Sequence, residues 1–211
     1  MRLRTPPGRA GRLWLRHRIE TAGHAADLLE HKRRELEAEL RRLEAVRSRA
    51  AHALQAAVAE AARSLAFVDA AVATGQVGAA ASFEGAATLE VDWRNVVGVR
   101  YPIRAQVGFG PPARLSMFPG GAALAEARDA HRRALEAAVA SAAAEAAHGR
   151  VRAEWERTSR TARALDLEVL PSHRAALAAL ELRLDEEERE DVTRVRWARS
   201  RSRTVGGRPH G

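Results

Sequence analysis

The chain has 211 residues, of which 46% are hydrophobic, 4% aromatic and 29% charged, and it contains no cysteine. The lack of cysteine excludes disulfides, thiolate nucleophiles and cysteine-ligated zinc or iron–sulfur sites. The apolar fraction is too high for a wholly disordered protein. Because 47 of the residues are alanine, whose side chain is small, a thick globular core is not expected.

The net charge of +8 is concentrated at the two ends of the sequence. Residues 1–18 and residues 194–211 each contain six arginines and no acid, so the two ends together carry +12 and residues 19–193 carry −4. Lys32 is the only lysine, and this arginine bias, together with the excess of alanine, is typical of a genome-wide composition bias. Basicity alone is therefore weak support for nucleic-acid binding.

Residues 11–74 are dominated by Ala, Leu, Glu and Arg, which are strong helix formers, and contain no proline. They predict one long helix. Apolar residues recur along it in steps of three and four, the spacing of a coiled-coil seam, with an extra step of four from Leu54 that would locally unwind a supercoil. The predicted seam residues of this helix are Leu36, Leu40, Leu43, Leu54, Val58, Leu65 and Val68.

Residues 75–121 contain eight glycines and four prolines, so a continuous helix is excluded there. Apolar and polar residues alternate on both sides of Arg94 and Asn95, which predicts two short antiparallel strands over about 88–103, joined near these two residues. The middle of the chain is thus a small β-hairpin head. Its Gly108–Pro112 stretch lacks the spacing and the following lysine of a phosphate-binding loop.

Helical composition returns over residues 122–200, which predicts a second arm. Gly149 and Pro171 interrupt it, and a bend or break is expected near both positions. At Pro171 the reason is that proline has no N–H and crowds the preceding turn. Residues 1–10 and 201–211 are expected to be flexible basic ends. The predicted seam residues of this arm are Leu170, Leu177, Leu180 and Leu184.

Two long seamed helices that flank a compact middle predict a mainly α fold, a long antiparallel two-helix coiled coil formed by the N- and C-terminal arms with the hairpin between them. If both arms reach the same tip, residue i faces roughly residue 211 − i. That register would place Trp14 near Trp197 and Leu36 near Ala175 or Ala176.

The sequence gives no indication of a catalytic, cofactor or metal site, because an extended helix pair forms no deep pocket. Lys32 lies in a helix and cannot serve a Walker-type loop. His17, His24 and His31 are seven residues apart, whereas zinc-binding histidines on a helix are four apart. The acidic run 185–191 alternates with arginines at helical spacing, which is typical of a salt-bridged solvent face.

Three blocks of the sequence resemble a known family. The last arm contains T-S-R-T from Thr158, A-L-D-L-E-V-L-P from Ala164 and L-R-L-D-E-E-E-R-E-D from Leu182. In order and spacing these are similar to the C-terminal signature of the D subunit of V-type ATP synthases, also called archaeal or bacterial A-type. The opening helix, with A-D-L-L-E-H-K-R from Ala26, and the segment N-V-V-G-V-R-Y-P from Asn95 resemble the same family. Arg163 stands where the family usually has asparagine, and alanine replaces many larger core residues.

The resemblance implies a non-catalytic central rotor shaft of a rotary ATP synthase or ATPase, which binds no nucleotide and no cofactor. It implies as partners the A and B catalytic subunits, the F subunit and a C-type subunit that couples to the membrane ring, and a cytoplasmic location peripheral to the plasma membrane. Under this hypothesis the tip made by both termini enters the ring of A and B subunits.

The arginines at the two ends are the candidate contacts with the catalytic head: Arg12, Arg16, Arg194 and Arg196. The alternative for these residues is solubilising charge on frayed ends. The alternative for the whole chain is a free-standing basic-tipped coiled-coil scaffold or a nucleic-acid-associated protein. Nucleic acid is the less favoured partner, because aromatic residues are scarce and the body of the chain is acidic.

Overall fold

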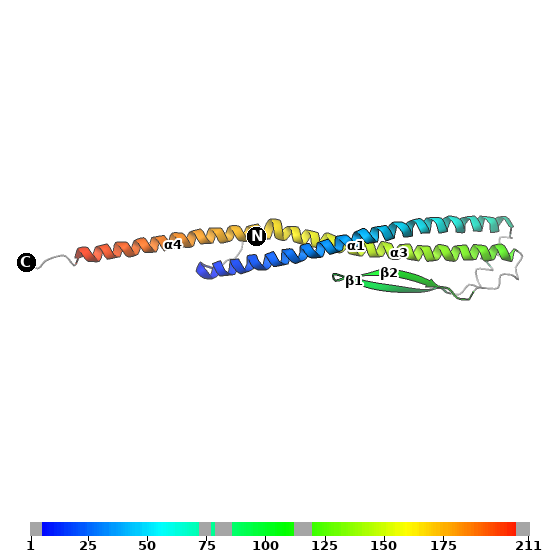
Figure 1. Cartoon of the computed structure of the whole chain (residues 1–211), viewed down its shortest axis with the longest axis horizontal. Coiled ribbons are helices and arrows are strands. Elements are labelled where there is room, and N and C mark those ends of the chain that lie inside the picture. The colour runs from blue at the N-terminus through cyan, green and yellow to red at the C-terminus, as the bar shows by residue number, and fades with distance from the viewer. Residues whose placement is uncertain (1–5, 72–76, 79–85, 112–119, 206–211) are drawn as a thin grey trace, which may run out of the picture. The chain divides into compact units, whose positions relative to one another are not determined.

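The computed structural model describes residues 6–71, 77–78, 86–111 and 120–205. In chain order the elements are α1 (Gly8–Ala71), β1 (Thr88–Val96), β2 (Val99–Gly108), α3 (Gly121–Ala164), the π-helical segment η2 (Leu165–Val169) and α4 (Leu170–Val205) (Figure 1). The chain is thus mainly helical with one antiparallel hairpin, as the sequence predicts. Among the described residues, no helix is both long and apolar enough to span a membrane.

The chain divides into two compact units, and α1 contributes to both. One unit contains residues up to His31 together with those from Ser159 onward, and the other contains Lys32–Thr158. This division differs from the three consecutive regions that composition suggests, because each unit is built by pairing segments that are distant in the sequence.

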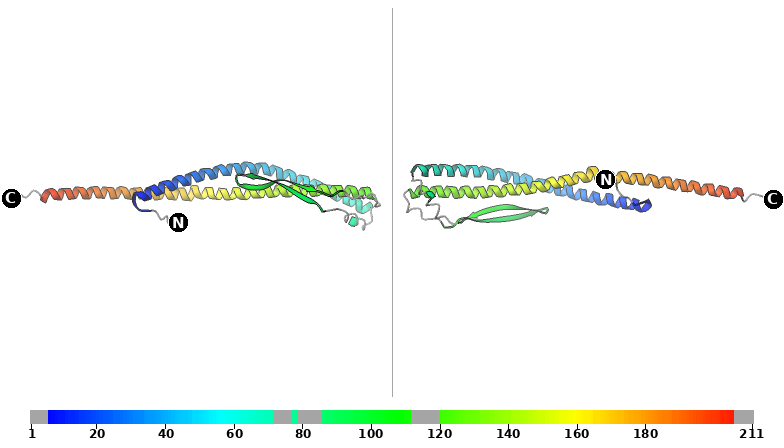
Figure 2. Two further views of the ribbon diagram at one scale, coloured as in Figure 1. Left: turned by 90° about the horizontal axis from the view of Figure 1, so that it is seen from below. Right: turned by 180° about the vertical axis from the view of Figure 1, so that it is seen from behind.

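In the unit Lys32–Thr158, α1 runs antiparallel to α3, as the interhelical ion pairs show. Arg47 Nη1 lies 3.0 Å from Glu145, and Arg133, earlier in α3, lies 2.7 Å from Glu60, later in α1. Figure 2 shows α1 and α3 side by side in further views of the ribbon. Two apolar clusters fill the space between the elements. One cluster contains Leu36, Leu43, Tyr101, Ala147 and Val151, and the other contains Val68, Leu124 and Ala127.

This packing corrects the register expected from the sequence. Leu36 packs in a cluster with Ala147 and Val151 instead of lying near Ala175. The expected register assumed that both arms end at one tip. Heptad spacing, however, indicates only which face of each helix is apolar. The alignment of the two helices is set by specific contacts between them, which the spacing does not contain.

In the other unit, the first turns of α1 pair with α4. Arg9 forms an ion pair of 3.1 Å with Glu188, and Arg16 forms one of 2.7 Å with Glu181. Since α1 begins at Gly8, α4 continues beyond the start of α1 up to Val205 (Figure 1). Trp197 therefore lies beyond the end of the pairing and not beside Trp14 as expected.

The backbone that leads into α1 requires a glycine at position 11. Gly11 is buried, and a Cβ atom at this position would collide with the carbonyl oxygen of Pro6 and approach Leu180 Cδ2 to 3.2 Å. Leu15 and Leu180 are also buried, 0% and 5% exposed. The start of α1 is therefore packed into the unit, so the expectation of flexible residues 1–10 does not hold for 8–10, which are helical.

The two expected interruptions of the second arm differ in outcome. Gly149 does not interrupt α3, which is continuous from Gly121 to Ala164 because one glycine costs only about 1 kcal/mol in a helix interior. Pro171 is the second residue of α4, which follows η2, and the Leu170 N–H bonds to the Leu165 carbonyl. The wider π-helical turn precedes the proline, so the chain stays helical through Pro171 and on to Val205, past the expected end at residue 200.

The hairpin extends over Thr88–Gly108, five residues longer than expected, with a β-bulge between Asp92 and Trp93. Its turn is at Val97 and Gly98 and not near Arg94 and Asn95. Both turn residues have positive φ, 46° and 87°, which is the geometry of a type I′ hairpin turn. Valine is rarely found with positive φ because its branched Cβ is crowded there, which explains why the sequence does not indicate a turn at this point.

Candidate functional site

The predicted seam residues of α1 divide into buried and exposed ones. Leu36, Leu43 and Val68 are buried, 0%, 3% and 0% exposed, whereas Val58 is 51% exposed and does not belong to the seam. Buried and half-buried residues instead follow one another along α1 in an unbroken alternation of four and three, also after Leu54, so the helix needs no extra four-residue step. Besides Leu36 and Leu43, the positions of this alternation are Leu40, Arg47, Ala50, Leu54, Ala57, Ala61, Ser64 and Val68. Leu65 is half-buried beside them.

The predicted seam residues of the second arm all lie in α4. Leu170 and Leu180 are buried, 7% and 5% exposed, and Leu177 and Leu184 are half-buried. From Asp185 onward every described side chain of α4 is exposed. The seam therefore ends near Leu184, close to the point where α1 begins.

The structure does not bring the four predicted tip arginines together. Arg16 pairs with Glu181, whereas Arg194 pairs within α4, 3.6 Å from Asp191 and 4.0 Å from Glu190. Glu181 and Arg194 are 13 residues apart, which corresponds to about 20 Å along a helix at 1.5 Å per residue. Arg12 is half-buried, and its Nε has no hydrogen-bond partner among the described residues.

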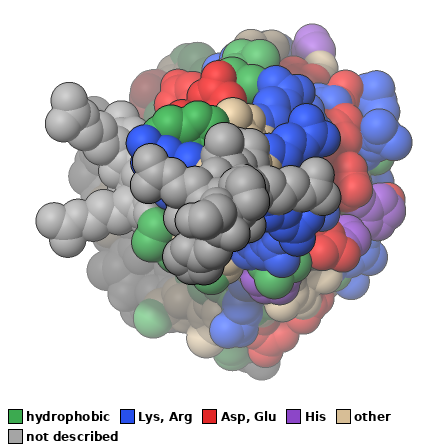
Figure 3. All heavy atoms as spheres, turned by 90° about the vertical axis from the view of Figure 1, so that its left-hand side faces the viewer, with side chains coloured by type: hydrophobic (Ala, Val, Ile, Leu, Met, Phe, Trp, Pro, Cys, Tyr) green, Lys and Arg blue, Asp and Glu red, His purple; other side chains and the backbone are tan. Residues whose placement is uncertain are grey.

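Of the four predicted tip arginines, only Arg194 and Arg196 therefore lie on the part of α4 that continues beyond α1, and both are exposed. Figure 3 views the molecule from the end of α4, where basic side chains lie beside acidic ones on the visible face. The exposed side chains of this end make it one candidate interaction surface.

A second candidate surface is the hairpin, which is attached to α1 by a cluster of three polar side chains. Tyr101 of β2 is fully buried, and its hydroxyl donates a hydrogen bond to Glu39 Oε1. Arg42 donates to Glu39 at 3.1 Å through Nε and to the Tyr101 hydroxyl oxygen at 3.4 Å. Glu39 and Arg42 are one helical turn apart on α1, so their side chains lie on the same face and can both reach Tyr101.

These contacts shift the pKa values of the carboxyl and the phenol in opposite directions. The hydrogen bond from Arg42 lowers the pKa of Glu39, with a further contribution from the Tyr101 hydroxyl, because both bonds favour the ionised carboxylate. Burial raises the pKa of Tyr101, and its hydrogen bond to the Glu39 carboxylate raises it further, because both favour the protonated phenol.

Attachment of the hairpin is therefore expected to weaken at both ends of the pH scale. A lowered carboxyl pKa contributes stability above the unfolded value of about 4.3 and loses it as the pH falls, and a raised phenol pKa contributes stability below about 10 and loses it as the pH rises. Hydrogen exchange of residues 88–108 should be slowest at intermediate pH after correction for intrinsic rates. Glu39→Gln should remove the acid limb of this profile and Tyr101→Phe the alkaline limb. Unchanged profiles in both variants would contradict this role of the cluster.

Trp93 connects the other side of the hairpin to α3. The guanidinium of Arg100 lies 4.9 Å from the centre of its ring and that of Arg150, from α3, lies 5.0 Å away. Arg150 Nη1 also donates to the Arg100 carbonyl oxygen at 3.2 Å. Contacts of a cation with an indole ring contribute about 0.5–1 kcal/mol each at exposed sites, so this stack helps to hold the hairpin against the helices.

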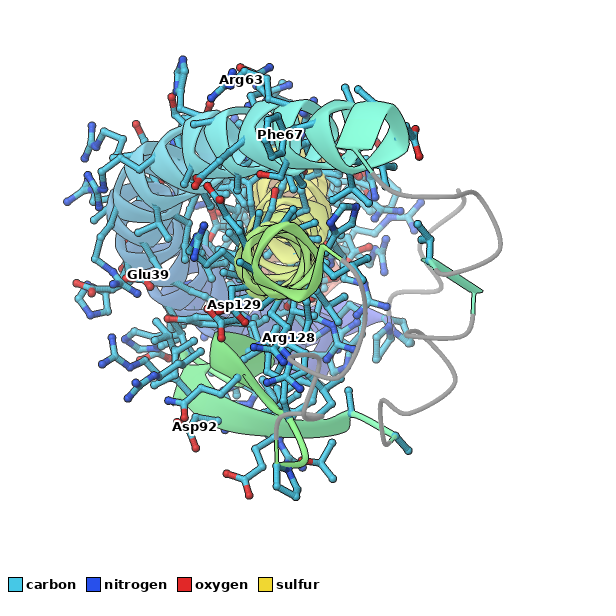
Figure 4. The ribbon with its side chains drawn as sticks, turned by 90° about the vertical axis from the view of Figure 1, so that its right-hand side faces the viewer. Glu39, Arg63, Phe67, Asp92, Arg128 and Asp129 are labelled. Atoms are coloured by element: carbon cyan, nitrogen blue, oxygen red, sulfur yellow. The ribbon has the colours of Figure 1, made fainter. Side chains whose placement is uncertain are left out.

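A groove of about 410 Å³ lies between the hairpin and the two helices of this unit. Its floor is largely alanine, and its polar side chains are Arg42, Arg94 and Arg104. Figure 4 shows Asp92 on the outer side of the hairpin and Phe67 on α1, on the side of the helix pair away from the hairpin. The groove contains no acid–base pair or nucleophile, and no group of three potential metal-ligating side chains occurs in the described residues.

Sequence reasoning missed the polar cluster and the interhelical ion pairs. Tyr101 is 62 residues from Glu39, and no local pattern joins two such positions. One signal was present: Tyr101 is the only tyrosine and Lys32 the only lysine. Both are used in contacts between elements, since Lys32 Nζ lies 2.6 Å from Glu154.

Comparison with known proteins decides the family. The family model for the ATP synthase D subunit matches residues 13–200, which include all of the described strands and nearly all of the helices. This chain belongs to the ATP synthase D-subunit family. It is 34% identical over 205 residues to the V-type ATP synthase D subunit of Anaeromyxobacter sp. (strain Fw109-5), with 94% of each chain covered.

The same family assignment follows from two further relatives. The V-type ATP synthase D subunits of two strains of Thermus thermophilus are each 31% identical to this chain over 213 residues. In both cases the match covers 97% of this chain and 94% of the relative. This member of the D-subunit family thus aligns with its relatives along both helical arms and the hairpin, which confirms the resemblance found in the sequence.

Proposed function

We propose that the chain is the non-catalytic central-stalk subunit of a rotary V/A-type ATP synthase. In this role it transmits torque between the ion-driven membrane ring and the catalytic head of A and B subunits, during synthesis or hydrolysis of ATP. The observation that carries the proposal is the family match over residues 13–200. The described helices within this range are paired in antiparallel fashion within each unit.

The contacts between the helices suit torque transmission. A twist applied to one helix must be passed to its partner, and the ion pairs Lys32–Glu154, Arg47–Glu145 and Arg133–Glu60 cross between α1 and α3. Backbone hydrogen bonds resist stretching of each helix, and the buried heptad seam resists sliding of one helix against the other. None of these contacts provides a reacting group, which is consistent with a coupling role.

We propose that the chain contacts the A and B subunits, the F subunit and a C-type coupling subunit, and lies peripheral to the plasma membrane on the cytoplasmic side. The end of α4 beyond Glu188 is the candidate for contact with the catalytic head, because its side chains are exposed and include Arg194 and Arg196. Arg12 and Arg16 belong to a different part of the surface, where Arg16 already pairs with Glu181.

Two paired substitutions test this assignment in the assembled complex. Arg194→Gln with Arg196→Gln should reduce ATP synthesis relative to ATP hydrolysis several-fold while the thermal unfolding of the free chain stays within about 0.5 kcal/mol, as for exposed positions in general. Arg12→Gln with Arg16→Gln should mainly lower the stability of the unit that contains them. Arg49→Gln with Arg160→Gln, at exposed positions away from both groups, serves as the matched control.

Affinity purification of the tagged chain from its own cell tests membership in the complex. Recovery of A, B and F subunits supports the proposal. Recovery of nucleic acid that dissociates at high salt, without these subunits, would support the alternative nucleic-acid-associated protein. Fully coupled ATP synthesis in the Arg194→Gln, Arg196→Gln complex would reject the role of these two arginines but not membership.

A further inference from the structure

The outer edge of the hairpin has no partner strand. Among the described residues the sheet has two strands, and no backbone hydrogen bond joins β1 to an element other than β2. No residue of β1 is buried, whereas Tyr101 and Pro102 of β2 are, so the helices cover β2 more closely. Figure 4 shows Asp92, in the middle of β1, on the outer side of the hairpin. The edge of β1 is therefore accessible to a further strand.

Every second residue of β1 carries the unpaired backbone groups of this edge. Val96 and Val99 flank the two-residue turn, so they bond to each other across the hairpin. Because backbone groups alternate along an antiparallel strand, every second residue counted from Val96 bonds to β2, and the residues between them direct their N–H and C=O groups outward. These outward residues are Leu89, Val91, Trp93 and Asn95. Such a row of free donors and acceptors is a template for another strand.

The side chains of β1, T-L-E-V-D-W-R-N-V, are complementary to their own reversed order about Asp92. Reversal places Glu90 opposite Arg94 and Val91 opposite Trp93. An ion pair and a contact between a β-branched and an aromatic side chain both stabilise neighbouring antiparallel strands. Glu90 and Arg94 are exposed, and neither belongs to an ion pair in the described part of the chain, although Arg94 contributes to the lowered pKa of Glu39.

We propose that the free chain forms a dimer in which β1 pairs antiparallel with β1 of a second copy, giving one four-stranded sheet. The two-fold axis passes through Asp92, so every other contact occurs twice. All nine residues of each strand are then paired. The outward backbone groups of Val91 bond to those of Trp93 in the other copy. Because a two-stranded hairpin is at best marginally stable in water, the added strands stabilise the sheet of both copies.

The side chains favour this register over the alternatives. Only shifts by two residues keep the outward backbone groups opposite each other. One such shift places Glu90 opposite Asp92, and the other places Trp93 opposite itself, although Arg100 and Arg150 already cover part of its ring. Either shift also leaves two residues of each strand unpaired. An in-register parallel copy would place each charge opposite the same charge, which is destabilising.

Asp92 lies opposite its own copy at the axis, which is the unfavourable contact of this dimer. Its cost is reduced because Arg104 is the partner of Asp92 across the hairpin, and Arg94 of the second copy lies diagonally opposite. The interface is small, so the dimer is expected to depend on concentration and salt. Asp92→Asn removes the repulsion and should tighten the dimer. This result is specific to the register, since neither shifted register places Asp92 opposite itself.

Charge substitutions test the interface in the purified, nuclease-treated full chain. Sedimentation equilibrium at low salt should show a monomer–dimer equilibrium for the wild type. Glu90→Arg should weaken the dimer by about tenfold, because it places arginine opposite Arg94 twice, and adding Arg94→Glu to the same chain should restore it. Residues 90 and 94 of one chain are about 14 Å apart along the strand, so restoration reports pairing between copies. Glu35→Arg, at an exposed position of α1, is the matched control and should leave the equilibrium unchanged.

Cysteine cross-linking tests the position of the axis, and the wild-type chain has no cysteine that would interfere. Directly opposite residues at such a position have Cα atoms about 4.5 Å apart, which a disulfide can span. Asp92→Cys alone should therefore form a disulfide-linked dimer. Glu90→Cys alone should not, because the two copies of residue 90 are about 14 Å apart along the strands. Mixing Glu90→Cys with Arg94→Cys should give the mixed dimer.

Hydrogen exchange tests the backbone pairing without a substitution. The amides of the outward residues Leu89, Val91, Trp93 and Asn95 should exchange more slowly as the concentration of the chain rises. The amides of Thr88, Glu90, Asp92 and Arg94 should change less, since they already bond to β2.

The proposal is overturned by a wild-type chain that stays monomeric at high concentration and low salt, by a dimer that Glu90→Arg does not weaken, or by cross-linking of Glu90→Cys as efficient as that of Asp92→Cys. A chain that stays monomeric would mean that the charges of β1 keep this edge unpaired, as charges on edge strands commonly do. Association that disappears on nuclease treatment would show bridging by nucleic acid and would also overturn it. The dimer concerns the free chain, so none of these results bears on the proposed central-stalk role.

Discussion

Tyr101→Ala is expected to release the hairpin from the helices. Tyr101 is fully buried in the cluster with Leu36, Leu43, Ala147 and Val151, so its truncation removes the largest side chain of that cluster and leaves a cavity. Such aromatic truncations cost about 3–5 kcal/mol. An isolated two-stranded hairpin is at best marginally stable in water, so residues 88–108 should lose protection from hydrogen exchange while the helix content stays close to that of the wild type.

Tyr101→Phe separates the contribution of the hydroxyl from that of the ring. It keeps the packing and removes the hydrogen bonds with Glu39 and Arg42, which should cost about 1–3 kcal/mol because both partners are charged. Ile103→Ala, at a 44% exposed position of the same strand, is the matched control and should have a small effect. Full protection of the hairpin in Tyr101→Ala would mean that the Trp93 stack with Arg100 and Arg150 holds it without the tyrosine.

The heptad pattern predicted which face of α1 is buried but not every member of the seam. Leu36 and Leu43 lie where the spacing puts them, since hydrophobic periodicity reports a face of a helix directly. The sequence prediction placed Val58 in the seam through a second step of four from Leu54. In the structure the heptad continues through Ala57 and Ala61, and Val58 is exposed. In a chain so rich in alanine, residue size is a poor guide to the seam, and unbroken spacing is the better one.

The alignment of the helices and the hairpin attachment could not be predicted for a different reason. Both depend on contacts between distant residues, such as Arg47 with Glu145 and Tyr101 with Glu39, and many other pairings of arginine with glutamate satisfy the same local pattern. The hairpin turn was misplaced because Val97 adopts a positive φ that its side chain disfavours. Local propensity thus predicted the elements, and tertiary contacts decided how they align.

The ion pair between Lys32 and Glu154 is expected to contribute more than the exposed ion pairs of this chain. Its side chains are 27% and 22% exposed, and Nζ lies 2.6 Å from Oε1. Exposed pairs contribute about 0–1 kcal/mol because water screens them and ordering the side chains costs entropy. A half-buried pair is less screened, and removal of either partner leaves the other partly desolvated. Single substitutions should therefore cost about 1–3 kcal/mol in the free energy of unfolding.

The two single substitutions should differ in a way that the structure predicts. After Lys32→Met, Glu154 still has Arg157 at 3.5 Å, one turn along α3. After Glu154→Gln, Lys32 has no carboxylate within ion-pair distance among the described residues, so this variant should be the less stable of the two. Urea unfolding of both variants and of the double variant gives the coupling energy, which should be about 1 kcal/mol and fall as salt is added.

The exposed pair of Arg152 and Glu156 on α3 provides the control for this cycle. It joins two residues of one helix, with side chains 64% and 41% exposed, and pairs at this spacing contribute about 0.2–0.5 kcal/mol. Its coupling energy should therefore be smaller than that of Lys32 with Glu154. Equal coupling energies for the two pairs would show that burial does not strengthen the interhelical pair. In that case the buried seam, and not the ion pairs, would have to provide the resistance to sliding that the proposed torque transmission requires.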